Sequence, residues 1–261
     1  MTTGARPLFL TIPFSHYCEK ARWALDRAGI DYEERPYPPG MHRFGTRRVG
    51  GRSVPVLVVP SDGSSATGET TLSDSSDILQ WIDARSPQTA LFGDDDAKRS
   101  QILALEDRFD LDLGPSTRRL AYFHLLQDAR SSVKLMTRTL SRPTAMLFRA
   151  AFPALRALMR RTMRIDSEGA SRSLDKIRAV FSEVAARLAD GRRYLVGDRL
   201  SAADITFAAL ATPVIAPPEV KQLPAQSDIP EGFLALIAEM RATPAGEFAL
   251  RVYRDDRALR A

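Results

Sequence analysis

The chain is poor in the residues that build disulfide frameworks and metal sites. Its 261 residues include one cysteine, Cys18, and three histidines that lie far apart in the sequence. A single cysteine excludes an internal disulfide and a thiolate-rich metal site, and scattered histidines argue against a His-based one. We therefore expect no bound metal and a thiol-tolerant, cytoplasmic compartment.

Long apolar runs are also missing. The longest candidate, residues 205–218, contains three prolines and falls short of the roughly 18 apolar residues that a membrane-spanning helix needs. The apolar run near the N-terminus, residues 7–14, lacks a basic start and a small-residue cleavage site. We expect neither a membrane span nor a signal peptide.

Acidic residues are absent from one stretch of the chain. Between Asp128 and Asp166 there are nine basic residues and no acidic one, whereas residues 1–90 hold ten of each sign. The net charge of +5 is therefore unevenly placed, and the chain as a whole is not a polybasic nucleic-acid binder. We call residues 129–165 the basic segment.

Strand and helix signals alternate over the first 86 residues. Short apolar runs predict strands, and apolar residues at helical spacing predict a helix that stops at Gly29 and another capped by Ser73 or Asp74. A turn cluster occupies residues 60–65. The expected strands are residues 8–12, 31–36, 54–59 and 69–72, the first helix is residues 17–28, and a short helix lies between the second and third strands.

The pattern changes after Pro87. A polar linker with three consecutive aspartates is followed, from about Lys98 onward, by segments of helical spacing alone. A switch from alternating strands and helices to helices marks a domain boundary. The sequence therefore predicts an α/β domain at residues 1–86 and an all-α domain at residues 95–261.

The first motif with chemical content is S-H-Y-C-E-K-A-R-W-A-L at residues 15–25, directly after the first expected strand. A hydroxyl or thiol ahead of a helix lies near unpaired backbone N–H groups and the positive end of the helix dipole, which stabilise an anion. Ser15 is thus either a helix N-cap or a catalytic hydroxyl. Cys18, inside the first helical turn, is more simply a small buried residue.

Two further motifs present backbone and side-chain polar groups. Val54-Pro55 opens the strongest strand signal, and a cis bond there would turn the backbone of Val54 toward a ligand, whereas a trans bond would leave a plain edge-strand proline. Asp74 and Ser75 stand at a helix start and can cap it. The same carboxylate and hydroxyl also suit the ammonium and carboxylate of an amino-acid headgroup.

In this order and spacing, the three motifs resemble those of the glutathione transferase superfamily. The resemblance implies a thioredoxin-like N-terminal domain followed by an all-helical domain. By position, it implies that Ser15 activates the thiol of glutathione, that Val54 and Pro55 contact its cysteinyl part, and that Asp74 and Ser75 hold its γ-glutamyl group. A basic side chain ahead of the V-P motif often contacts the glycyl carboxylate in this family. His42 and Arg43 are the candidates that we put first, with Arg47 and Arg48 as others.

A fourth stretch, Y-L-V-G-D-R-L-S-A-A-D-I at residues 194–205, is similar to a structural motif of the family's second domain. Its Ser201 and Asp204 form a near capping box. Two departures stand out: Asp74 replaces the usual glutamate, and His16 follows Ser15 where the commonest motif of this subgroup has proline. The chain is also longer than a typical member, and the surplus falls within residues 120–170.

The resemblance implies a serine-type glutathione transferase, a homodimer that uses glutathione as co-substrate against a small hydrophobic electrophile. Two alternatives stay open: a glutathione-fold binding or regulatory protein without turnover, and a glutathione-dependent thiol-disulfide oxidoreductase that uses Cys18. For the basic segment we favour a helical hairpin that packs on its own domain and shows arginine to solvent. The other interpretations are a peripheral membrane contact and a basic funnel that attracts anionic substrates.

Overall fold

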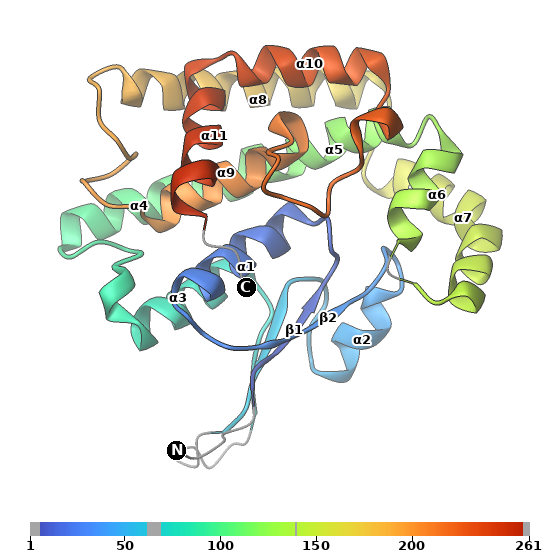
Figure 1. Cartoon of the computed structure of the whole chain (residues 1–261), viewed down its shortest axis with the longest axis horizontal. Helices are drawn as coiled ribbons and strands as arrows, with labels where there is room; N and C mark the ends of the chain where they lie inside the picture. Colours follow the sequence, from blue (N-terminus) through green and yellow to red (C-terminus); the bar gives the residue numbers. More distant parts are fainter. Residues whose placement is uncertain (1–5, 62–68, 139, 258–261) are drawn as a thin grey trace. The chain divides into compact units, whose positions relative to one another are not determined.

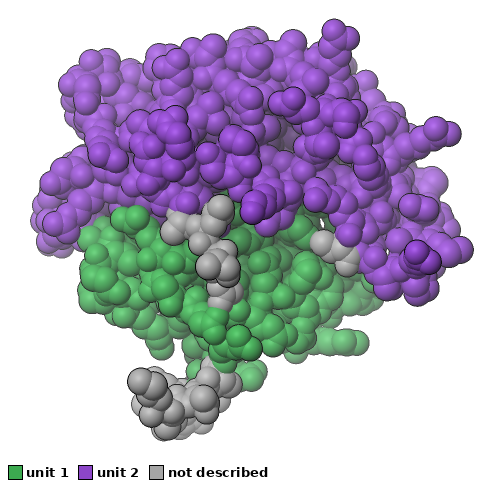
Figure 2. Space-filling model, viewed as in Figure 1, with its two compact units in different colours: residues 1–92, 258–261 green, residues 93–257 purple. Residues whose placement is uncertain are grey.

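The computed structural model describes residues 6–61, 69–138 and 140–257, so residues 62–65 of the expected turn cluster lie outside it. The chain divides into two units, residues 1–92 with 258–261, and residues 93–257 (Figure 2). Each unit has its own buried core, and we describe them separately.

The first unit is built on a four-stranded sheet with the order β2-β1-β3-β4 (Figure 1). β1 is parallel to β2 and antiparallel to β3, and β3 is antiparallel to β4. A parallel pair needs a crossover, which the first helix supplies between β1 and β2. The strands are β1 (Leu8–Thr11), β2 (Glu33–Pro36), β3 (Val56–Val59) and β4 (Thr70–Leu72). The thioredoxin-like fold predicted for this part of the chain is confirmed.

In the described part of the first unit, the helices are α1 (His16–Arg27), α2 (His42–Arg48) and α3 (Ser75–Arg85), followed by the short 3-10 helix η1 (Pro87–Thr89). α1 and α3 pack against each other, and α2 packs on β1. The predicted helix stop is present, because Gly29 adopts φ +66° and closes α1. The N–H of Gly29 donates to the carbonyl of Asp26 and that of Ile30 to the carbonyl of Leu25, both at 3.1 Å, which is a Schellman motif.

The described part of the second unit is helical, as the sequence predicts. α9 is buried along nearly its whole length and packs against α4, α5, α10 and α11. A helix that is apolar on all sides is stable only when it is enclosed in this way. The helices are α4 (Asp96–Arg108), the π-helix η2 (Phe109–Leu113), α5 (Gly114–Leu125), α6 (Ala129–Thr137), α7 (Arg142–Thr162), α8 (Ser167–Leu188), α9 (Ala202–Ile215), the 3-10 helix η3 (Gln226–Asp228), α10 (Glu231–Arg241) and α11 (Pro244–Asp256).

The basic segment forms α6 and α7, which pack against each other. Phe148, Phe152 and Met159 of α7 are buried, whereas Met146 and Leu147 on the same helix are 70% and 68% exposed. The predicted helical hairpin is present. Its solvent-facing side differs from the prediction, because α7 exposes apolar as well as basic side chains. Among the described residues, no helix is both long enough and apolar enough to cross a membrane.

Candidate functional site

Ser15 lies directly after β1 and forms the N-cap of α1. Its hydroxyl oxygen accepts from the N–H of Cys18 at 3.4 Å, and its carbonyl oxygen accepts from the N–H of Glu19 at 2.9 Å. The side chain is half-buried. A bond of 3.4 Å is long for an N–H donor and a hydroxyl, so the cap is a weak one. The hydroxyl thus lies at the positive end of α1 with partial access to solvent.

Cys18 is fully buried one helical turn further along α1. Burial raises the pKa of its thiol to about 11, while a hydrogen bond with Ser15 and the charge of Arg22 act in the opposite direction. The thiol is therefore protonated at neutral pH, unlike the exposed, low-pKa thiols of redox sites. These two effects act on the Cys18 thiol alone, and the charge of Arg22 is already met by the carboxylates of Glu19 and Glu34.

The Val54-Pro55 peptide bond is cis, as expected from the family resemblance. Pro55 is buried and Val54 is half-buried, immediately ahead of β3. In the sheet, Val56 lies opposite Leu10 of the antiparallel strand β1. Val54 thus precedes β3 at the end where β3 meets the last residues of β1, and Ser15 follows β1 at this end, with its N–H donating to the carbonyl oxygen of Ile12 at 3.0 Å. Val54 and Ser15 therefore share one end of the sheet.

Asp74 is the N-cap of α3. Its carboxylate accepts from the N–H of Ser76 at 2.8 Å, and its side chain is otherwise exposed. Ser75, the first residue of the helix, is buried. The fully buried Lys20 of α1 donates from Nζ to the hydroxyl oxygen of Ser76 at 3.1 Å. This bond joins the first turn of α3 to the helix that Ser15 caps, so two of the three motifs are brought together.

The basic candidates all lie on α2. His42 begins α2, and its Nδ1 accepts from the N–H of Gly40 at 3.2 Å. Burial, and then the charge of Arg43, lowers the pKa of His42. Arg43 is exposed, as are Arg47 and Arg48. No hydrogen bond joins any of them to Ser15, Val54 or Asp74 within the described residues, and their role stays a prediction.

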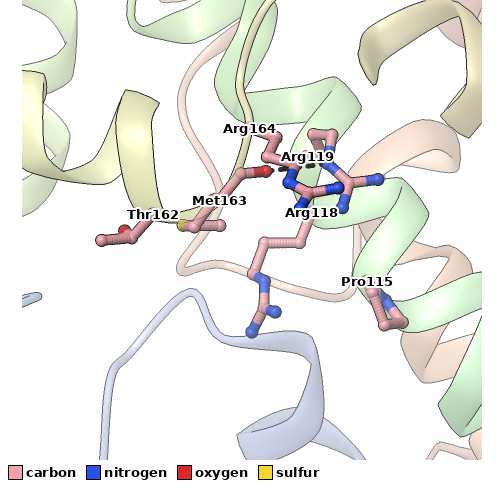
Figure 3. Close-up of a pocket in the computed structure, with 6 residues that line it drawn as sticks. All are labelled: Pro115, Arg118, Arg119, Thr162, Met163 and Arg164. Atoms are coloured by element: carbon pink, nitrogen blue, oxygen red, sulfur yellow. Dashed lines mark hydrogen bonds between the residues drawn. The ribbon is translucent and has the colours of Figure 1, made fainter.

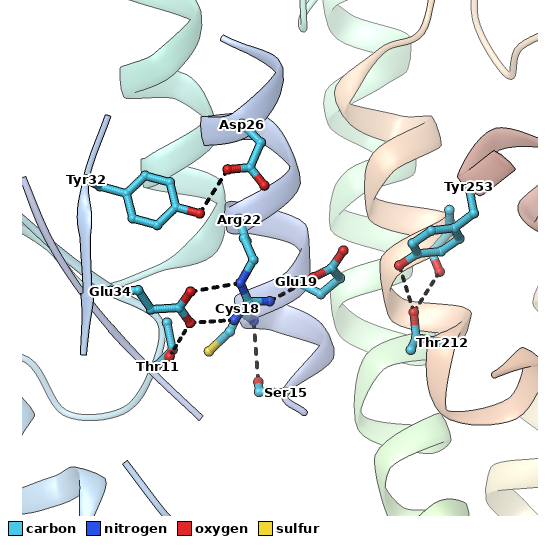
Figure 4. A network of polar contacts seen from close by, with 11 residues as sticks. Thr11, Ser15, Cys18, Glu19, Arg22, Asp26, Tyr32, Glu34, Thr212 and Tyr253 are labelled. Atoms are coloured by element: carbon cyan, nitrogen blue, oxygen red, sulfur yellow. Dashed lines mark hydrogen bonds and ion pairs between the residues drawn. The ribbon is translucent and has the colours of Figure 1, made fainter. Parts of the chain in front are cut away.

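A buried ion network, which the sequence did not predict, joins α1 to β2 (Figure 4). Arg22 of α1 donates to Glu19 at 2.7 Å and to both carboxylate oxygens of Glu34 on β2, at 2.7 Å and 3.2 Å. Glu34 also accepts from the hydroxyl of Thr11 at 2.6 Å. Burial by itself lowers the pKa of Arg22, but the two carboxylates outweigh it and raise the pKa. The network ties the start of α1 to β1 and β2 and thereby holds Ser15 in place. Arg22 lies within the first motif, but nothing in the sequence pointed to its role or to Glu34 as its partner.

Two domain models identify the family. Residues 9–90 match the N-terminal domain of glutathione S-transferase, and residues 167–233 match its C-terminal domain. Together the matches cover more than half of the chain. The chain belongs to the glutathione transferase superfamily and carries both of its domains.

Solved structures share this fold over nearly the full length. Glutathione transferase GSTFuA3 from Phanerochaete chrysosporium is 15% identical, with a TM-score of 0.64 over 98% of this chain and 99% of that one. A glutathione S-transferase from Methylobacterium radiotolerans, solved with glutathione sulfonate, is 20% identical, with a TM-score of 0.53 over 94% and 95%. A family member from Pseudomonas fluorescens, solved with two glutathione molecules bound, is 16% identical, with a TM-score of 0.55 over 96% and 94%. At these identities the likeness concerns the fold. No curated protein sequence matches the chain.

Proposed function

We propose that the chain is a serine-type glutathione transferase that ionises the thiol of bound glutathione for attack on a small hydrophobic electrophile. The observation that carries this proposal is the half-buried Ser15 hydroxyl at the N-terminus of α1. It lies at the positive end of the helix dipole, where a hydroxyl donor and unpaired N–H groups stabilise an anion. A free thiol has a pKa well above neutrality, so this stabilisation decides how much of the glutathione is nucleophilic.

The remaining contacts follow the peptide from its sulfur to its headgroup. The backbone of Val54 pairs with the cysteinyl residue, at the same end of the sheet as Ser15. The exposed carboxylate of Asp74 accepts the γ-glutamyl ammonium, and Ser75 binds the neighbouring carboxylate. The two related proteins solved with glutathione or glutathione sulfonate support this choice of ligand.

The chemical step needs no further cofactor. The glutathione thiol gives up its proton to solvent, its sulfur forms a bond to the electrophilic carbon, and the leaving group departs with the bonding electron pair. Cys18 takes no part, because a buried thiol with a pKa of about 11 is a poor nucleophile at neutral pH. The active species is a homodimer in the cytoplasm, as the family resemblance implies.

The experiment measures glutathione binding and thiol ionisation together. The full chain is applied to immobilised glutathione, and the ultraviolet absorbance of the thiolate is then recorded for the complex in solution. We expect retention, a thiolate signal near neutral pH, and turnover of an activated aryl halide. Ser15→Ala should keep retention while losing the thiolate signal and turnover.

Thr243→Ala is the matched control. Thr243 caps α11 by accepting from the N–H of Gly246 at 3.0 Å, which is the same i+3 bond that Ser15 makes, but in the second unit. It should leave the thiolate signal unchanged. Retention of the wild type without a thiolate signal would favour the binding or regulatory protein, and no retention at all would refute the proposal.

A further inference from the structure

The second unit contains a pocket with arginine-rich walls (Figure 3). One wall is the beginning of α5, and the other is the end of α7 with the turn that follows it. The cavity has a volume of about 290 Å³ and is lined by Pro115, Arg118, Arg119, Thr162, Met163 and Arg164. We call it the arginine pocket. All of its lining residues belong to the second unit.

Arg119 is the fixed cation of the arginine pocket. Its Nε donates to the carbonyl oxygen of Met163 at 2.9 Å, and its Nη1 donates to the hydroxyl of Ser173 at 2.9 Å. Ser173 is fully buried in α8 and donates in turn to the carbonyl oxygen of Gly169 at 2.8 Å. Arg119 is thus held between α5, the end of α7 and α8, and its guanidinium does not need to be ordered by a ligand.

The other two arginines have no structural role that explains them. Within the described chain, the side chains of Arg118 and Arg164 make no ion pair or hydrogen bond, and both are exposed. Arg164 also adopts a positive φ of +49°, a conformation that costs a residue with a side chain about 1 kcal/mol. The tight turn after α7 therefore places a cation at the rim at some expense of stability.

Positive charge is in excess around this cavity. Of the two carboxylates that follow on α8, Glu168 pairs with Arg172, and Asp166 accepts from the N–H of Gly169 at 2.6 Å as the N-cap. Burial, followed by the charges of Arg172, Arg118 and Arg164, lowers the pKa of Arg119, and Asp166 only partly opposes this. An anion that enters the cavity would relieve the repulsion among three guanidinium groups.

We propose that the arginine pocket binds a small molecule through a doubly charged oxyanion of the phosphate or sulfate type. The planar forks of Arg118 and Arg164 each match two oxygens of such a group, and with the positive charge of Arg119 the pocket provides enough charge for a dianion. The volume of about 290 Å³ lies just below the range of drug-sized ligand sites, which suits a small ligand. Arg119 is half-buried, so a group must enter the cavity to reach it, which a flat lipid surface cannot do.

The arginine pocket agrees with one interpretation of the basic segment, the basic funnel that attracts anionic substrates. Arg164 is part of that segment, and its position favours attraction of an anionic ligand. Arg118 and Arg119 come from α5, outside the segment, and sequence reasoning did not connect them with it. The proposal does not rest on glutathione binding by the first unit.

Isothermal titration calorimetry of the full chain with inorganic phosphate tests the proposal, with ionic strength held constant by sodium chloride and without glutathione. We expect one phosphate to bind to the wild type. Arg118→Gln and Arg164→Gln should each weaken binding on the order of tenfold, the effect of losing one hydrogen bond to a charged group. Circular dichroism checks that each variant is folded.

Arg149→Gln is the control, because Arg149 is an exposed arginine on α7 that does not line the cavity. It should leave phosphate affinity unchanged. Absence of binding by the wild type, or an equal loss in all three variants, would overturn the proposal. Vesicles of anionic lipid that displace phosphate from the wild type but not from Arg164→Gln would also overturn it, by assigning the site to a lipid headgroup.

Discussion

Each unit contains helix-capping Ser and Asp side chains, yet the two sets differ in what they can still bind. In the second unit Asp204 is fully buried and accepts from the N–H groups of Leu195 and Ser201, both at 2.8 Å, and from the hydroxyl of Ser201 at 2.6 Å. In the first unit the exposed Asp74 accepts from a single N–H, that of Ser76. A cap that is buried and saturated serves the fold, whereas a cap with free acceptor capacity in solvent can serve a ligand as well.

The largest expected effect comes from Asp204→Ala. This change leaves the buried N–H groups of Leu195 and Ser201 without an acceptor. The free energy of unfolding should fall by about 4 kcal/mol, because each orphaned donor costs on the order of 1–3 kcal/mol. Urea denaturation followed by circular dichroism measures it. Asp198→Ala, in the exposed part of the same motif, should stay within ~0.5 kcal/mol of the wild type. Equal losses in both variants would contradict the comparison.

The free energy of unfolding should depend on pH through the titration of the buried Asp204 carboxyl. Burial raises the pKa of Asp204 from 3.8 to about 6, so between these values the folded chain binds more protons than the unfolded chain. The contribution of Asp204 to the free energy of unfolding therefore falls as pH rises from about 4 to about 6 and is constant above. Two pKa units correspond to at most about 3 kcal/mol.

Asp204→Asn isolates this contribution, since the amide does not titrate. Denaturation of the wild type and the variant across this pH range should give slopes that differ in the stated direction. Identical slopes would show that Asp204 titrates alike in the folded and unfolded chain.

Asp74→Ala should weaken glutathione binding more than it lowers the free energy of unfolding. Loss of a charged hydrogen bond to the γ-glutamyl ammonium should raise the glutathione Kd by about 10-fold to 100-fold, since such bonds contribute roughly 1.5–3 kcal/mol. The lost cap should reduce the free energy of unfolding by only ~1 kcal/mol. The control is Asp128→Ala, because Asp128 caps α6 through the N–H of Arg130 at 2.8 Å, the same i+2 bond. An unchanged glutathione Kd in Asp74→Ala would show that Asp74 does not bind the γ-glutamyl ammonium.

The smallest effect is expected for Cys18→Ala. Turnover with glutathione should be nearly unchanged, and the free energy of unfolding should fall by ~1 kcal/mol for the lost contacts of a small buried side chain. The native thiol should react slowly with iodoacetamide near neutral pH, because burial keeps it protonated. Rapid alkylation, together with inactivity of Cys18→Ala, would move the site to Cys18 and the chemistry to thiol-disulfide exchange.

Most of the first unit could be predicted because its signals are local. The buried run of β3, the glycine stop of α1 and the capping of α3 by Asp74 each depend on residues within a few positions of one another. The cis bond before Pro55 was expected from the family resemblance, since a V-P pair in a strand is equally compatible with a trans bond. The exposure of Met146 and Leu147 was not foreseen, because helical spacing alone does not tell which apolar face of α7 is covered.

The sequence by itself determined the elements of the first unit and their order, the helical class of the second unit and the family, since periodicity, caps and motif spacing act over a few residues. Only the tertiary structure decided which distant side chains meet. Arg22 pairs with Glu34 on β2, and Lys20 donates a hydrogen bond to Ser76 at the start of α3. Arg119 joined α5 to the turn after α7, which placed it beside Arg164 and formed the arginine pocket. Burial and charge depend on such contacts between residues far apart in the chain, and so do the pKa values and binding capacities on which function rests.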